Sequence, residues 1–134
     1  EPELNLHPKN QRAFARLVAR MGNAGIKVFI TTHSDYLIKE LNTLIMLNQQ
    51  TAHTRAVQSQ HGYADNELIN PNRVRLYTTA LESVKIAGAA RSSKIRTLRL
   101  ANIHADRGIE VETFDDTIET MNTIQSEILY GGEL

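Results

Sequence analysis

Apolar residues recur at helical spacing in two parts of the first fifty residues. In the first part they fall at i, i+3, i+4 and i+7, and they are Phe14, Leu17, Val18 and Met21. This pattern predicts an amphipathic helix of about four turns that begins near Pro8 and ends at the Gly/Asn-rich segment 22–25, with Lys and Arg on its opposite face. A second pattern predicts a helix over about 35–48, capped by Ser34 or Asp35, although the apolar run 44–47 is also compatible with a strand.

Between these helices lies a short and almost wholly apolar run, Ile26-Lys27-Val28-Phe29-Ile30-Thr31. A glycine precedes it and a polar Thr-Thr-His-Ser turn follows it, which is typical of a strand buried on both faces of a parallel sheet. A strand–helix–strand unit then requires a further strand before Glu1. We therefore interpret the chain as the C-terminal part of a longer polypeptide.

The apolar pattern is lost over residues 49–72, which are rich in Gln, Asn, His, Ser and Gly. This polar excursion exceeds the usual loop length, so we expect it to be either functional or mobile. Alternation then predicts strands over 73–79 and about 94–101, and a short strand at 109–112. A last helix is indicated by Phe114, Ile118, Met121, Ile124 and Ile128, with Thr113 or Asp115 as its cap and Gly131-Gly132 as its stop. Residues 73–134 are thus predicted to form a β-rich extension with a C-terminal helix.

The formal net charge of the chain is zero, but the charge is unevenly distributed. Residues 1–50 carry six basic against four acidic residues, residues 51–107 carry nine against four, and residues 108–134 carry none against seven. Such an arrangement most often indicates internal ion pairing and less often a phosphate-binding face. The absence of cysteine excludes disulfides and thiolate metal sites, and no apolar run approaches the roughly 20 residues of a membrane span, so we expect a soluble, cytoplasmic protein.

Two residues are candidates for the chemistry of nucleotide hydrolysis, which needs a carboxylate to hold the attacking water and donors to stabilise charge on the γ-phosphate. Glu1 is the candidate carboxylate. His33 follows the predicted strand at the edge where ligands bind in open α/β sheets, so its imidazole could contact the phosphate. Taken singly, an exposed glutamate and a structural histidine would be the commoner interpretations.

The complete pattern changes this balance: Glu1-Pro2-Glu3-Leu4-Asn5-Leu6-His7-Pro8, a helix, an apolar strand, then Thr31-Thr32-His33-Ser34. It resembles the C-terminal half of the ABC-type ATPase head of RecF/SMC-like and overcoming-lysogenization-defect-like ATPases. The resemblance implies an α/β P-loop fold for residues 1–48, in which helices flank a parallel sheet.

The same resemblance assigns roles to individual residues. It implies that Glu1 is the catalytic glutamate that ends the Walker B motif and that His33 is the H-loop histidine, so that both contact the nucleotide. Asn5, Leu6 and His7 would lie in the D-loop at a dimer interface. ATP and Mg²⁺ are the implied cofactors, and both require an N-terminal half, because this sequence contains no phosphate loop, no Asp before Glu1 and no signature motif.

Two further phrases, Thr32 to Asn42 and Gly108 to Asp115, resemble the ATPases of Septu-type anti-phage systems, including those that accompany some retrons. This implies a bacterial defence protein. Its partners would be the remainder of its own ATPase head, further copies in a homodimer or higher oligomer, and an HNH-type nuclease. The alternatives are a regulatory scaffold that binds nucleotide without hydrolysis and a DNA-repair or SMC-like ATPase that acts on nucleic acid.

Nucleic acid could also bind a basic cluster in the second half, which consists of Arg91, Lys94, Arg96 and Arg99. We prefer a different interpretation of this cluster, namely ion pairing with Glu110, Glu112, Asp115 and Asp116. No metal site is expected in this chain, because the remaining histidines, His7, His53, His61 and His104, show no metal-ligand spacing.

Overall fold

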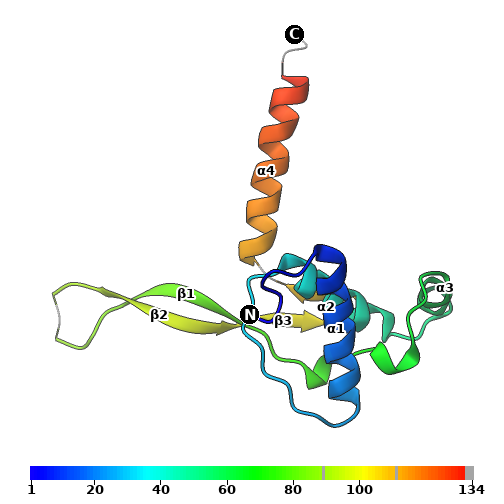
Figure 1. Ribbon diagram of the computed structural model, residues 1–134. Helices are drawn as coiled ribbons and strands as arrows, with labels where there is room; N and C mark the ends of the chain where they lie inside the picture. Colours follow the sequence, from blue (N-terminus) through cyan, green and yellow to red (C-terminus); the bar gives the residue numbers. More distant parts are fainter. Residues whose placement is uncertain (89, 111, 132–134) are drawn as a thin grey trace.

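The computed structural model describes residues 1–88, 90–110 and 112–131 of the chain. A small body contains helices α1 (Pro8–Asn23), α2 (Asp35–Leu47) and α3 (Ala52–Gln60). Two elements project from this body in different directions: a long hairpin of β1 (Tyr77–Val84) and β2 (Ser93–Leu100), and helix α4 (Glu112–Tyr130) (Figure 1).

The first two helices form where the apolar spacing predicts them. Pro8 occupies the first turn of α1, where its missing N–H costs nothing, and His7 caps the helix by accepting a hydrogen bond from the amide of Lys9 (3.3 Å). Ser34 caps α2, since its Oγ accepts from the amide of Leu37 (3.1 Å). The alternative of a strand at 44–47 is wrong, because α2 continues through Leu47.

The core lies between α1 and α2, but the residues buried most deeply on α1 are not those of its predicted stripe. Ala15 and Ala19 are buried, whereas Leu17 is exposed. Small side chains let two helices approach closely, so the alanines face the partner helix. They pack with apolar residues of α2, of the segment before β1 and of the last hairpin, which are Leu37, Ile38, Leu44, Ile45, Ile69 and Ile109.

Residues 26–31 do not form the predicted strand. The segment is irregular, and the described chain contains no parallel sheet: its two sheets are antiparallel pairs, β1–β2 and β3–β4. The side chains are also exposed, with 91% of Phe29 accessible to solvent and Ile26 and Val28 exposed as well. A buried parallel strand needs a neighbouring strand and covering helices, and among the described residues no strand pairs with this run.

The polar residues 49–72 fold onto the body, so the predicted excursion is better ordered than its composition suggests. They form α3 and two short 3₁₀ helices, η1 (Asp65–Glu67) and η2 (Pro71–Arg73). Leu68 and Ile69 are buried, and the amide of Ile69 donates to the carbonyl of Leu44 in α2 (3.2 Å). His53 and His61, in contrast, are exposed to solvent.

The described part of the second half contains strands, and they pair as two antiparallel hairpins. In β1–β2, Tyr77 lies opposite Leu100 and Val84 lies opposite Ser93, so the first strand begins later than the predicted 73–79. A second hairpin pairs β3 (Asn102–His104), which the sequence pattern did not predict, with β4 (Gly108–Glu110).

The last helix, α4, is confirmed over Glu112–Tyr130. The prediction that Thr113 or Asp115 caps it is wrong, because α4 begins at Glu112 and both residues lie within the helix. Gly132, one of the two glycines of the predicted stop, lies outside the described residues. No helix in the described ranges combines the length and the apolar character that crossing a membrane would require.

Candidate functional site

Glu1 and His33, which are 32 positions apart in the sequence, lie side by side in the structure. Glu1 Oε1 is 3.0 Å from His33 Nε2. The His33 side chain is 90% exposed and that of Glu1 is 35% exposed, so both groups can be reached from solvent. The structure therefore brings together the two side chains that sequence reasoning selected, one a carboxylate and the other an imidazole.

A third residue, Glu3, holds the two segments together. Its buried carboxylate accepts hydrogen bonds through Oε1 from the hydroxyl of Thr32 (2.5 Å) and from the backbone amide of His33 (3.1 Å). Its other oxygen, Oε2, is buried and has no partner among the described residues. Because Glu3 binds the backbone of His33, it fixes where that residue lies relative to the turn that carries Glu1.

Glu3 can hold these donors because it stays ionised. Burial acts to raise the pKa of its carboxyl, but the hydrogen bonds from Thr32 and from the amide of His33 act in the opposite direction and outweigh it. The net result is a pKa below the usual value for glutamate. At neutral pH the carboxylate is therefore charged, and the clamp on the His33 loop is intact.

Further hydrogen bonds tie this clamp to both helices. Thr32 Oγ1 accepts from the amide of Ser34 (3.0 Å), and the Ser34 hydroxyl, which also caps α2, donates to Gln11 Oε1. Gln11, on α1, donates through Nε2 to the carbonyl of Leu6 (2.9 Å). The turn at the start of the chain, the first turns of α1 and α2 and the His33 loop thus form one network.

Sequence reasoning missed three members of this network, namely Glu3, Gln11 and Thr32. A signal existed for Glu3 and Thr32, because Glu3 stands in the motif that identified Glu1 and Thr32 stands in the motif that identified His33. None existed for Gln11, which reads as one more polar residue on the exposed side of a helix.

The remaining residues of the opening motif have local structural roles. Asn5 has a positive φ of 67°, a backbone conformation that asparagine tolerates better than most residues, and it makes the bend between the Glu1 turn and α1. Leu6 is half-buried, and His7 caps α1. A contact of Asn5, Leu6 and His7 with a partner head stays a prediction.

The basic cluster lies on the β1–β2 hairpin, an element separate from Glu1 and His33. Arg91, Lys94, Arg96 and Arg99 are all exposed. The preferred ion pairing is wrong where the structure describes it: Arg99 pairs with Glu82 on the neighbouring strand (3.0 Å), and Glu110 lies 3.2 Å from His104. The other proposed acidic partners, Glu112, Asp115 and Asp116, lie outside the described side chains.

The side chains of Glu1 and His33 suit only part of what ATP and Mg²⁺, the cofactors implied by the motifs, would need. A carboxylate beside an imidazole suits a water molecule and a phosphate oxygen. It does not provide a set of oxygen ligands for Mg²⁺, and within residues 1–88, 90–110 and 112–131 no group of three or more His, Cys, Asp or Glu residues could hold a metal ion.

Comparison with known proteins gives one match. The family model described as "AAA domain, putative AbiEii toxin, Type IV TA system" matches residues 1–39, which is under a third of the chain. No curated protein matches the chain, and no solved structure matches it. The matched segment contains Glu1, Glu3 and His33, and it supports an AAA/ABC-type P-loop ATPase family and a nucleotide-binding, ATPase-like function in general.

Proposed function

We propose that residues 1–39 contribute part of an ATP-hydrolysing site, in which Glu1 holds the attacking water and His33 donates a hydrogen bond to the γ-phosphate. The observation that carries the proposal is the contact of 3.0 Å between these two exposed side chains. The family match supports it, because the match covers both residues. Carboxylates and imidazoles are also the groups that most often move protons in catalysis.

In this proposal Glu3 is a positioning residue. It touches neither water nor phosphate, but its carboxylate holds the amide of His33 and the hydroxyl of Thr32. A phosphate-contacting group must be held to within a fraction of an ångström to stabilise charge that develops during the reaction. The buried clamp explains how an imidazole that is 90% exposed can be placed that reproducibly.

ATP and Mg²⁺ would be held mainly by groups from the remainder of the ATPase head. Residues 26–31 support such a partner, since they form an irregular, mostly apolar and largely exposed segment directly before the His33 loop. Pairing of this segment with a strand of the head would bury Phe29 and satisfy its backbone donors and acceptors. It would also bring His33 to the carboxyl-terminal edge of a parallel sheet, where such ligands bind.

The substitution Glu1→Gln in the full-length protein tests the proposal. Gln keeps the shape of the side chain but cannot accept a proton, so we expect the rate of phosphate release to fall by about 10²-fold or more, with ATP still bound. Glu110→Gln is the matched control, because Glu110 also contacts a histidine, His104, at 3.2 Å. Unchanged turnover in Glu1→Gln would reject the role of Glu1. A wild-type protein that binds ATP without releasing phosphate would instead favour the non-hydrolysing scaffold.

We further propose that the complete protein acts in the cytoplasm in bacterial anti-phage defence and controls an HNH-type nuclease. This finer proposal rests on the Septu-like phrases around His33 and Gly108. It is tested by co-expression with the candidate nuclease: the two proteins should co-purify, and DNA cleavage should depend on whether ATP is present. A nuclease that neither co-purifies nor responds to ATP would leave the ATPase proposal standing and reject the defence partner.

A further inference from the structure

The β1–β2 hairpin exposes an apolar face that no described part of the chain covers. Residues that lie opposite each other across the two strands share a face, and alternate pairs share the same one. One face therefore carries Tyr77 with Leu100, Thr79 with Leu98, Leu81 with Arg96, and Ser83 with Lys94. The apolar members are well exposed, including 69% of Leu98 and 61% of Leu81. This hairpin face is apolar towards the body of the protein and basic towards the tip.

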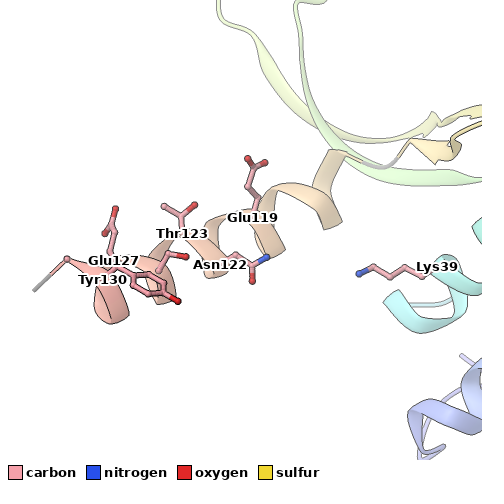
Figure 2. A pocket seen from close by; sticks show the side chains of 8 residues that line it. Lys39, Glu119, Asn122, Thr123, Glu127 and Tyr130 are labelled. Atoms are coloured by element: carbon pink, nitrogen blue, oxygen red, sulfur yellow. The ribbon is translucent and has the colours of Figure 1, made fainter. Parts of the chain in front are cut away.

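Helix α4 exposes a second apolar face. Met121, Ile124 and Ile128 follow each other at i, i+3 and i+7, so they form one stripe, and all three are exposed. The opposite side of the helix is polar: Glu119, Thr123 and Tyr130 line an open hollow that faces Lys39 on α2 (Figure 2). The polar side of α4 is therefore turned towards its own body, and the apolar α4 stripe is turned away from it.

The two elements that carry these faces have opposite net charges and similar lengths. Residues 77–100 carry five basic residues and one acidic residue, a net charge of +4, whereas residues 112–130 carry five acidic residues and no basic one. Strands of eight residues extend about 27 Å at 3.4 Å per residue, and a helix of 19 residues extends about 28 Å at 1.5 Å per residue. A helix of this length can cover the hairpin from end to end.

We propose that the apolar stripe of α4 packs across the hairpin face of a second copy of the same chain, and that the exchange is reciprocal. Each copy then buries both of its exposed apolar faces, which is the arrangement of a two-fold symmetric dimer. Glu127, three positions after Ile124 on the helix, borders the stripe, and the long Arg and Lys side chains at the hairpin tip can reach its carboxylate past the apolar contact.

Other occupants of these faces fit less well. The hairpin of the same chain is disfavoured, because α4 turns its stripe away from its own body and the two elements project in different directions (Figure 1). Two α4 helices packed together would repel each other, since each carries five acidic residues and no basic one, and both hairpin faces would stay exposed. The proposed contact also needs no nucleotide, which separates it from the D-loop dimer.

Single cysteines test this contact directly, because the chain has no cysteine of its own. In the full-length protein without nucleotide, we would mix a Leu98→Cys variant with an Ile124→Cys variant and oxidise the mixture. The mixture should give at least about tenfold more disulfide-linked dimer than either variant alone, because the contact raises the local thiol concentration. Ser126→Cys, on the hollow side of α4, replaces Ile124→Cys in the control and should give no such product.

Three results of this experiment would overturn the proposal. Cross-linking of Ile124→Cys with itself, to the same extent as in the mixture, would show that two α4 helices pair. A chain that carries both Leu98→Cys and Ile124→Cys, and that forms only an internal disulfide, would show that the helix folds onto its own hairpin. An absence of every cross-linked product would mean that the two faces do not meet.

Charge reversal gives an independent measurement of the oligomeric state. The hairpin variant Lys94→Glu/Arg96→Glu makes both surfaces acidic, and the helix variant Glu119→Lys/Glu127→Lys weakens the acidic character of α4. Sedimentation velocity at low salt should show the hairpin variant alone to be largely monomeric and to form dimers when it is mixed with the helix variant. One of the two exchanged contacts in the mixture then joins the unchanged basic hairpin of the helix variant to the unchanged acidic α4 of the hairpin variant. A mixture that stays monomeric would contradict the exchange.

Discussion

At the scale of single residues, the most consequential contacts lie on the side of α1 that its apolar pattern assigns to solvent. Arg16 pairs through Nε and Nη2 with Glu67, which is only 3% exposed, and its guanidinium stacks over the ring of Tyr63 at 4.7 Å. Arg12 likewise pairs with the buried Glu40 (2.8 Å), whose second oxygen accepts from the Tyr63 hydroxyl. A buried carboxylate is tolerated only with such partners, so these pairs decide how residues 61–67 dock.

Removal of the Arg16 side chain should therefore destabilise the fold. Arg16→Ala leaves the carboxylate of Glu67 buried without its counter-ion, and we expect the free energy of unfolding to fall by about 3 kcal/mol. The control is Lys9→Ala, an exposed position in the first turn of the same helix, which should change it by less than about 0.5 kcal/mol. Urea unfolding measures both values, and equal losses would contradict the importance of the Glu67 pair.

The effect of Arg16→Ala should also depend on pH in a defined direction. The hydrogen bond from Arg16 outweighs burial and holds the pKa of Glu67 below its usual value of 4.5. A lowered pKa in the folded state gives stability that is present above 4.5 and is lost as the pH falls through the folded value. The stability difference between wild type and Arg16→Ala should thus be largest near neutral pH and shrink in acid, and a difference independent of pH would be inconsistent with this account.

At the scale of elements, the sequence predicts what local chemistry decides. Helices α1 and α2 follow from apolar spacing and from side chains that cap their ends, such as Ser34, and these signals lie within a few residues of the helix itself. Residues 26–31 have an equally strong strand pattern, yet a strand forms only with a neighbour, and the described chain provides none. Pairing is a property of two segments, so one segment's pattern cannot establish it.

The same distinction explains the candidate site and the polar residues 49–72. Glu1 and His33 could be predicted because each stands at a defined position in a sequence motif. The hydrogen bonds of Glu3 and Gln11 could not, because they depend on which segments meet in space. Residues 49–72 look like a loop because few of them are apolar. They nevertheless fold onto the body, because Glu67 forms an ion pair with Arg16 and the Asn23 side chain donates to the carbonyls of Asn66 and Leu68. The periodicity of apolar residues gives no sign of these contacts.

The docking of the short β3–β4 hairpin on α2 gives a prediction for an element. The amide of Ile109 donates to Asn42 Oδ1 (2.9 Å), and a Cβ at Gly108 would lie only 3.1 Å from the Asn42 side chain. Gly108 also has a φ of 79°, which side chains disfavour. Gly108→Ala should therefore cost about 1–2 kcal/mol for the backbone and about 1–3 kcal/mol more for the clash with Asn42.

Gly88 offers the matched control for this substitution. Its φ of 87° is similar, but a Cβ there would meet open space. Gly88→Ala should cost only the backbone part, about 1–2 kcal/mol. Thermal unfolding of both variants isolates the contribution of the close approach to Asn42, and equal shifts would mean that Asn42 moves aside without cost.

At the scale of the whole molecule, the exposed apolar surface of the described residues includes segment 26–31, the hairpin face and the α4 stripe. Contiguous apolar surface of this kind usually marks interaction sites. The proposals assign the first place to the remainder of the ATPase head and the other two to a second copy. Contact of residues 26–31 with the remainder of the head would affect the site of Glu1 and His33, because these residues lead directly into the His33 loop.

Hydrogen exchange can test the first assignment separately from the dimer. In the 134-residue chain the amides of residues 27–32 have no backbone acceptor among the described residues, so they should exchange almost as fast as in an unfolded peptide. In the complete head, pairing with a neighbouring strand should slow them by at least about tenfold, equivalent to about 1.4 kcal/mol of opening free energy. Amides paired between β1 and β2 are the internal control, since their ladder is complete within the chain and does not depend on the head. Unchanged exchange at 27–32 would mean that His33 reaches its place without a parallel strand behind it, and the clamp through Glu3 would then have to position the histidine alone.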